Sequence, residues 1–343
     1  MKKSLLLFGI IAWIAVLAAA AIIAGGVLRG GSGDLIFSDN AALLKEEDIA
    51  LAGMEDILIE TDSLDIGIYT TGEPQMMVRQ YGGANTAAEE LFVVTQNNGG
   101  IKIRVKHLFR LNVINFSFNE RLAVYIPETW LGDISVKVSS GNIRVDDAFI
   151  WRNAGFASSS GDLLLKRELH AENLSIDISS GNIHIREPLM VNGKLSAGTT
   201  SGDIRLNAPV QARSIYVRAF SGNIVMSEAA AEQFDLRSTS GDITAAGLSG
   251  GGSITASSGN ININLTEAVA DTDVQAGSGD IRIGVDASCS FNFTGRCSSG
   301  SIRANFPLNK NEQGNRASAS IGGSPAISIN AHTASGNINI NRR

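Results

Sequence analysis

Aliphatic and polar residues alternate along most of this chain with a period of two. Downstream of Met54, Leu64, Ile66 and Ile68 are separated by single polar or small residues, and the run IKIRV at 101–105 has the same spacing. Successive side chains of a β-strand point to opposite faces, so this spacing predicts strands with one apolar and one polar face. Turn signals such as TTGEP and QNNGG separate the runs, and no long helical pattern follows. The chain from residue 54 onward is therefore predicted to be all-β.

The alternation is organised into repeats of about 20 residues. From residue 139 onward, a Ser-Gly step followed by Asn, Asp or Ser and then an aliphatic residue occurs ten times. The first nine glycines follow one another at intervals of 18–21 residues, and the last interval, from 300 to 336, is 36 residues. The glycines are Gly141, Gly161, Gly181, Gly202, Gly222, Gly241, Gly259, Gly279, Gly300 and Gly336. An internal period of this length is typical of a solenoid, in which each coil contacts only its neighbours.

Each repeat places one strand before the Ser-Gly step and one strand after it. A single coil buries too few aliphatic side chains to offset the entropy of ordering about 20 residues. Stacked coils satisfy the strand edges and close the aliphatic layers into one core. We therefore predict a right-handed parallel β-solenoid (a β-helix) with coils of about 20 residues. Glycine supplies the backbone conformation of the corner, and we expect the serine hydroxyl to satisfy a corner amide.

The residue after each corner glycine alternates between an amide and a carboxylate. In chain order these residues are Asn142, Asp162, Asn182, Asp203, Asn223, Asp242, Asn260, Asp280, Ser301 and Asn337. Coils of about 20 residues stack them about 4.8 Å apart, so alternation keeps the carboxylates about 9.6 Å apart. Coils of about 40 residues would instead stack Asp on Asp. The alternation therefore favours the shorter coil.

The N-terminal segment differs from the rest because Leu5–Leu28 contains no charged residue. As a helix it is about 36 Å long, enough to cross a hydrocarbon layer of about 30 Å. An uncleaved anchor is favoured over a cleavable signal, because the apolar stretch of a signal is shorter. Lys2 and Lys3 precede the segment and Arg29 follows it, which places the N-terminus in the cytoplasm and the rest outside. We expect a single-pass cell-membrane protein with an extracytoplasmic C-terminal part.

Four segments are predicted. Residues 1–30 form the membrane anchor, and residues 31–53 a linker with a short helix at 38–53 that Ser38 or Asp39 caps. The remaining segments are an N-terminal β region that starts the solenoid at 54–130 and a repeat solenoid at 131–343, with an insert at about 307–324. The insert is expected to be a loop within an otherwise regular coil.

Composition narrows the partners and the redox chemistry. A formal charge of −6 and a pI near 5.3 give no support to a nucleic-acid partner, which favours a basic face. Two cysteines, Cys289 and Cys297, are too few for a disulfide framework, and they are eight residues apart. Two free, half-buried thiols are favoured, while a turn at Thr294–Gly295 would allow a disulfide.

The repeated polar residues do not predict a catalytic or metal site. Calcium-binding β-rolls need several oxygens per turn, whereas here a carboxylate occurs only in every second coil. Ten equivalent serines cannot each have a base, and the histidines share no motif with them: His107, His170, His184 and His332. No metal or cofactor is expected.

Two groups of side chains are candidates for ligand contacts. The arginines after the corners are expected to face outward as a solvated face, with a glycan-binding or lyase groove as the alternative: Arg144, Arg205, Arg282 and Arg303. The aromatic residues near the start of the solenoid are expected in the core or its cap, with an exposed patch as the alternative: Trp130, Trp151 and Phe156. At the chain end, Asn341, Arg342 and Arg343 are expected to protect a sheet edge by charge.

The chain resembles the DUF4097 family of β-strand repeat proteins, which are described as adhesins. The likeness is carried by the apolar N-terminal segment, MEDILIETDSLDIGIYT, the LAVYIPET strand and the repeated SSGNI and TSGDI steps, over about residues 54–343. It implies a bacterial envelope protein, in some members linked with envelope-stress systems. The family provides no catalytic residues to carry over.

Together these features favour a membrane-anchored, non-catalytic surface module that binds a protein or a cell-wall glycan, or serves as a structural element. Two alternatives belong to other classes: a glycan-active β-helix enzyme, and a cytoplasm-facing β-helix that polymerises end to end. The sequence selects neither a ligand nor an oligomeric state.

Overall fold

The computed structural model describes four stretches of the chain, residues 41–83, 86–106, 120–323 and 325–343. Contacts divide the chain into two compact units, residues 1–41 and residues 42–343, and the second contains all the described strands. The anchor predicted at residues 5–28 lies outside the described residues. Within the four described stretches, no helix has the length and apolar character needed to span a membrane.

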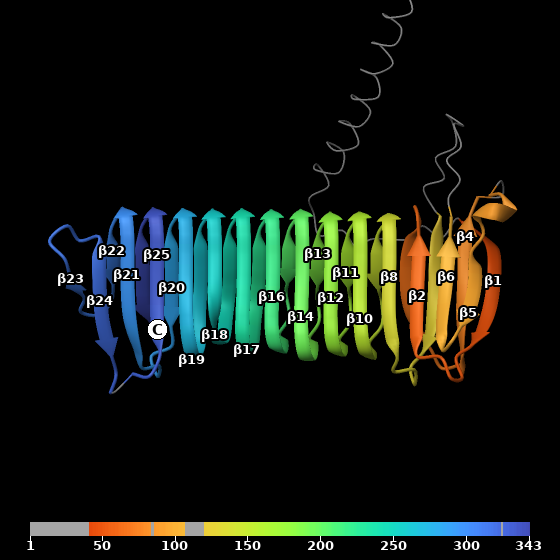
Figure 1. Cartoon of the computed structure of the whole chain (residues 1–343), viewed down its shortest axis with the longest axis horizontal. Coiled ribbons are helices and arrows are strands. Elements are labelled where there is room, and N and C mark those ends of the chain that lie inside the picture. The colour runs from red at the N-terminus through yellow and green to blue at the C-terminus, as the bar shows by residue number, and fades with distance from the viewer. Residues whose placement is uncertain (1–40, 84–85, 107–119, 324) are drawn as a thin grey trace, which may run out of the picture. The chain divides into compact units, whose positions relative to one another are not determined.

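The described residues form 26 strands in one sheet and a single 3₁₀ turn, η1 (Ala88–Glu90), which confirms the all-β prediction. Long strands, side by side in Figure 1, end at or near the corners: β2 (Asp56–Thr61), β6 (Gly100–Val105), β8 (Asp133–Ser140), β10 (Phe149–Ser160), β12 (Leu169–Ser180), β14 (Leu189–Ser201), β16 (Val210–Ser221), β17 (Ile224–Ser240), β18 (Ile243–Ser258), β19 (Ile261–Ser278), β21 (Phe291–Ser299) and β25 (Ser328–Ser335).

The other strands form a second face of the coils or cover the two ends of the stack. Strands after the corners are β3 (Asp65–Thr71), β7 (Arg121–Pro127), β9 (Ile143–Val145), β11 (Leu163–Leu165), β13 (Ile183–Ile185), β15 (Ile204–Leu206), β20 (Ile281–Val285), β22 (Ile302–Ala304) and β26 (Ile338–Arg342). Antiparallel strands at the ends are β1 (Ala42–Ala50), β4 (Gln75–Gly82), β5 (Val93–Asn97), β23 (Asn309–Lys310) and β24 (Arg316–Ile321).

The strands of the repeat pair in parallel with a shift of one coil. Phe156 of β10 pairs with Ile176 of β12, which pairs with Ala197 of β14. After the corner, Ile183 of β13 pairs with Ile204 of β15 in the same way. The pairs are 20 or 21 residues apart in sequence, as the repeat period predicts for a solenoid.

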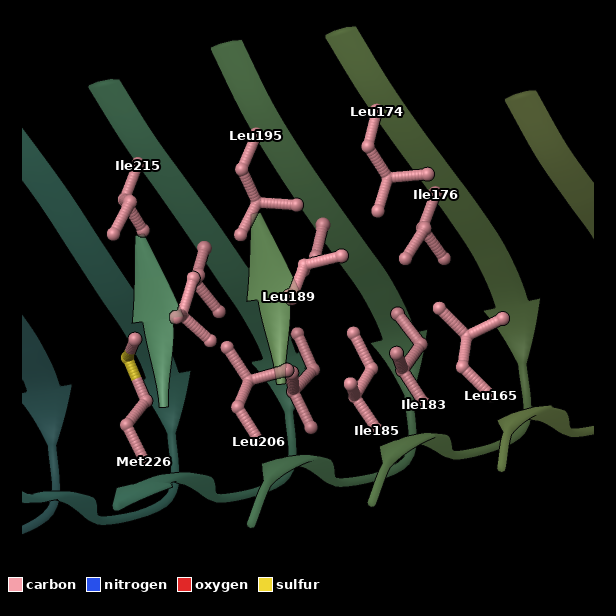
Figure 2. Close-up of a cluster of buried hydrophobic side chains, with 14 of the residues drawn as sticks. Leu165, Leu174, Ile176, Ile183, Ile185, Leu189, Leu195, Leu206, Ile215 and Met226 are labelled. Atoms are coloured by element: carbon pink, nitrogen blue, oxygen red, sulfur yellow. The ribbon is translucent and has the colours of Figure 1, made fainter. Parts of the chain in front are cut away.

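The aliphatic side chains of both strand sets meet in the interior. Figure 2 shows Leu174 and Ile176 of β12 gathered with Ile183 and Ile185 of β13, and the equivalent Leu195 in the next coil. These five side chains are at most 2% exposed. Full burial of a Leu or Ile side chain contributes about 1.5–3 kcal/mol, so each coil is stabilised mainly by the coils next to it.

The corners require glycine for a steric reason. All ten corner glycines have positive φ, between 132° and 155°. A Cβ added at Gly161 would lie 2.0 Å from the carbonyl oxygen of Gly141 in the preceding coil. Stacking at 4.8 Å therefore leaves no room for a side chain at this position.

The order of coils at the C-terminal end differs from their order along the chain. β25 pairs in parallel with both β19 and β21, and β26 pairs with both β20 and β22. The last coil therefore lies between the coils of Gly279 and Gly300. The insert forms β23 and β24, and β24 pairs antiparallel with the other side of β21. β21 therefore lies between β24 on its outer side and β25 of the C-terminal coil on its inner side.

Two predictions for this end are wrong. The insert at 307–324 is not a loop within a regular coil, because its β24 covers the outer side of the stack. Arg342 and Arg343 do not protect an edge. Arg342 pairs with Val285, and the Arg343 N–H donates to the Val285 carbonyl at 2.9 Å.

The N-terminal end repeats this arrangement. β2 lies between β6 and β8, and β3 lies between β7 and β9. β5 pairs antiparallel with β6, while β4 and then β1 extend the sheet from β7. The short helix predicted at 38–53 is wrong, because residues 42–50 form β1. Pairing with β4, which sets Ile49 opposite Met76, overrides the local helical preference.

Candidate functional site

The polar residues that follow the corner glycines form a continuous column of hydrogen bonds, called here the Asx file. At each step a backbone N–H donates to the side-chain Oδ1 of the preceding coil, over 2.7–3.1 Å. Its order in space is Asp65, Asn142, Asp162, Asn182, Asp203, Asn223, Asp242, Asn260, Asp280, Asn337 and Ser301.

Carboxylates and amides alternate strictly through Asn337 in the Asx file, although they do not along the chain. Asn337 lies between Asp280 and Ser301 because the last coil is intercalated. Each Asn side chain also donates its Nδ2 to the preceding carboxylate, as Asn182 does to Asp162 at 3.2 Å. The alternation gives every carboxylate an amide donor. This chemistry stabilises the corners.

The serine hydroxyls at the corners do not have the predicted role. The corner glycine N–H donates to the backbone carbonyl of the next coil, as Gly161 does to Ser180 at 2.9 Å. Interior hydroxyls bind the corner carbonyls instead: Thr199 Oγ1 donates to the Gly181 carbonyl at 3.0 Å. The Ser180 side chain itself is exposed.

The four arginines after the corners do not form a cluster. Arg144 is 8% exposed, a correction to its predicted solvation, because it is enclosed by an ion pair with Asp146 and a 3.1 Å hydrogen bond to the Tyr69 hydroxyl. Arg205 pairs with Asp203 at 2.6 Å, as Arg282 does with Asp280 at 3.3 Å; both arginines and Arg303 are exposed.

The predicted aromatic residues lie in the interior. Trp130, Trp151 and Phe156 are 9%, 2% and 1% exposed. The ring of Trp151 stacks on Phe149 with centroids 4.4 Å apart. These rings belong to the core, and they form no exposed patch.

The histidines and cysteines are scattered. His107 lies outside the described residues, and His184 is half-buried, where desolvation lowers its pKa. Cys289 and Cys297 are free, and burial raises the pKa of the Cys297 thiol. Among the described residues, no three His, Cys, Asp or Glu side chains are grouped to hold a metal ion.

The outward side chains of the long strands form a polar surface, called here the outer face. It crosses the strands in the order β6, β2, β8, β10, β12, β14, β16, β17, β18, β19, β25 and β21. An open groove of about 390 Å³ lies on it near β10, and a smaller hollow of about 180 Å³ lies near β25.

The larger groove has charged walls and a floor of small residues. Ala157 of β10 lies between Lys137 of β8 and Asp177 of β12, and Ser159 is the next outward residue of β10. Beyond Lys137, the Lys102 ammonium lies 2.8 Å from Glu60 and lowers the pKa of that carboxyl. Lys102 therefore holds Glu60 in its ionised form.

A second feature of the outer face is the aromatic–arginine cluster, defined by Lys194, Tyr216, Arg218, Phe220, Asp235 and Arg237. Tyr216, Arg218 and Phe220 alternate with buried residues along β16, so all three point outward. Phe220 is 59% exposed, whereas Asp235 is only 9% exposed. The Asp235 carboxylate accepts from Arg237 Nε at 2.6 Å and from Arg218 at 3.2 Å.

The sequence analysis missed this cluster because it drew no inference from the residue that precedes each Ser-Gly step. One position earlier, nine of the ten copies have Ser, Thr, Gly or Ala, and only the copy at Phe220 has a large apolar residue. An exposed aromatic residue at a place where the fold accepts a small one is the signal that could have found it.

Comparison with known proteins identifies the family. The family model described as "Toastrack DUF4097" matches residues 54–207 and residues 168–341. Similar solved structures include a "putative adhesin" from Bacteroides fragilis NCTC 9343, with 15% identity, a TM-score of 0.41 and coverage of 89% of this chain and 98% of that chain.

Two further structures show similar coverage. A "putative lipid binding protein" from Parabacteroides distasonis ATCC 8503 has 18% identity, a TM-score of 0.46 and coverage of 88% and 97%. A "putative adhesin" from Parabacteroides merdae ATCC 43184 has 13% identity, a TM-score of 0.45 and coverage of 88% and 97%. No curated protein matches the chain.

Proposed function

The chain belongs to the DUF4097 family, and on that premise we propose that it is a non-catalytic surface-binding module of the adhesin kind. In this proposal residues 5–28 anchor it in the cell membrane, and the solenoid lies outside the cytoplasm. The observation that carries the proposal is the outer face, a polar surface of twelve successive long strands.

The outer face suits binding because its side chains are held in fixed rows. Every long strand is hydrogen-bonded to its neighbours, and the alternate side chains are locked in the core, as Val217 and Ala219 of β16 are. The rows therefore repeat about every 4.8 Å on a backbone that is already ordered before binding. A long ligand with repeated polar groups can contact several coils at once, and weak contacts then add up.

The charged groups of this face support binding over catalysis. Glu60 has a lowered pKa beside Lys102, whereas a general acid needs a raised one. Asp235 is engaged by two arginines. These carboxylates position cations and are not available as a pair of acid and base.

The proposal is tested with the full chain produced in bacterial cells. Protease added to intact cells should remove the solenoid while leaving a cytoplasmic control protein whole. Purified full chain in detergent should bind isolated envelope material, and Lys137→Glu in the groove should weaken that binding if the groove contributes. Protection of the solenoid from protease would contradict the placement, and absence of binding to every envelope fraction would contradict the function.

A further inference from the structure

Phe220 is a departure from the repeat that the fold does not require. Its side chain is 59% exposed on the outer face, where a large apolar group gains only part of the energy of full burial. Five of the other nine copies have Ser at this place: Ser139, Ser159, Ser179, Ser257 and Ser298. An exposed aromatic ring at a position that accepts serine is typical of a contact for a ligand with an apolar face.

Two arginines beside this ring are held in place by a buried carboxylate. Arg218 of β16 pairs across the sheet with Arg237 of β17, so two like charges are adjacent. Asp235 accepts from Arg237 Nε at 2.6 Å and from Arg218 at 3.2 Å, and its side chain is 12% exposed. The guanidinium side chains are 60% and 54% exposed. Each arginine keeps donors that point to solvent and can bind an anion.

The cluster is locally basic on an acidic protein. The Lys194 ammonium lies 4.4 Å from the centre of the Tyr216 ring and adds a third cation. Three cations face one carboxylate here, while the chain as a whole has a formal charge of −6. Clustered positive charge of this kind raises the local concentration of anionic ligands.

The surface next to the cluster is low enough for a ligand to lie flat. The adjacent strand β14 presents Ser196 beside Tyr216 and Gly198 beside Arg218. Neither residue extends far from the sheet. A polymer lying across the strands could therefore reach Phe220 and the arginines from the β14 side.

The geometry points to a binding site for an acidic glycan at the aromatic–arginine cluster. The apolar face of a sugar ring packs on Phe220, and the carboxylate of the same or the next sugar binds Arg218 and Arg237. This inference rests on the proposed binding function and names the ligand class and the residues for it.

The test uses the full chain in detergent and three acidic glycans: polygalacturonate, alginate and hyaluronate. Each is compared with its methyl ester, which removes the charge and keeps the backbone. At least one acid form should bind about tenfold more tightly than its ester, and added NaCl should weaken that binding. The double variant R218Q/R237Q should lose about tenfold in affinity, and Phe220→Ser should lose several-fold.

Arg303→Gln is the matched control, since Arg303 is an exposed arginine on β22, which is not part of the outer face. It should bind as the unchanged chain does. Equal binding of every acid and its ester, or binding of neither, would overturn the ligand class. Unchanged affinity in both cluster variants would overturn the site. In either case the proposed function stands if the full chain still binds envelope material, so the two failures are distinguishable.

Discussion

At the scale of single residues, the corner is where sequence reasoning was most informative. Ten glycines at a period near 20 are readable as corners because only glycine tolerates the backbone there. The partners of the corner amides were not readable. Serine precedes every corner glycine, yet the Asx side chains and backbone carbonyls accept the amide protons. The positions of the corner amides could be predicted from the local sequence, whereas their acceptors belong to neighbouring coils and depend on how the coils stack.

Gly202→Ala tests the steric reason for the corners. The new Cβ would lie 2.0 Å from the Gly181 carbonyl oxygen, at a φ of +146°. We expect a loss of about 2–4 kcal/mol in unfolding free energy, measured by urea denaturation. Gly72→Ala is the matched control, because a Cβ at Gly72 has nothing within 4 Å. Equal stability of the two variants would contradict the steric argument.

Asn223→Asp tests the alternation in the Asx file. The variant places three carboxylates in successive coils, and it removes the amide that donates to Asp203 at 3.3 Å. Two repulsions across about 4.8 Å, each about 0.9 kcal/mol in water, predict a loss of about 1–2 kcal/mol at pH 7. The loss should shrink near pH 3 as the carboxylates protonate. A loss that is equal at both values of pH would contradict an electrostatic cause.

Asp280 contributes to the pH dependence of the stability of the unchanged chain. The backbone N–H of Asn337, together with its side-chain amide, holds the pKa of Asp280 below 3.8. Between the folded and the unfolded pKa of Asp280, the unfolded chain binds more protons than the folded chain. The stabilisation by Asp280 is therefore fully present above pH 3.8 and is lost as the pH falls through the folded pKa. Asp280→Asn should make the free energy of unfolding fall less steeply as the pH is lowered below 3.8. If the unfolding free energy of the variant depended on pH as that of the unchanged chain does, Asp280 would not contribute to the loss of stability in acid.

At the scale of elements, the coil period was predictable but the order of the last coils was not. Chain order puts Ser301 after Asp280, whereas the structure puts Asn337 there. The signal was present, because only this order keeps the alternation strict. The order of the last coils could not be inferred from the sequence, because it depends on the antiparallel pairing of β24 with the outer side of β21. Likewise, β1 was misread as a helix because its pairing with β4 is not local.

Removal of residues 325–343 tests the intercalation. The deletion leaves β19 and β21 without their shared neighbour and opens the core at Ile281 and Ile302, both fully buried in the intact chain. We expect the thermal midpoint to fall by more than 10 °C, or the C-terminal coils to unfold. The control replaces residues 311–315, at the tip of the insert, with Asn-Gly, which should change the midpoint by a few degrees. Similar effects of both changes would contradict an interior position for β25.

At the scale of the whole described unit, both ends are closed in the same way. The first and the last coil lie one place inside the stack, and antiparallel strands cover the coils that end it. An exposed parallel edge invites pairing with other chains, so this arrangement reduces that hazard. The charged edge strand β1, with Lys45, Glu46, Glu47 and Asp48, adds to it. The sequence analysis expected only the charged C-terminal residues to protect a sheet edge from pairing with other chains.

Hydrogen exchange of the full chain measures this closure directly. In a stack of coils stabilised by their neighbours, opening begins at the ends and protection rises toward the middle. A coil order that followed the chain would make residues 328–335 the least protected long strand. The intercalated order instead predicts that β25 exchanges more slowly than β24, with β21 between them, because β25 has a parallel strand on each side. At the other end β2 should exchange more slowly than β5 for the same reason. Faster exchange in β25 than in β24 would show that the last coil opens first, and the intercalated order would then not describe the protein in solution.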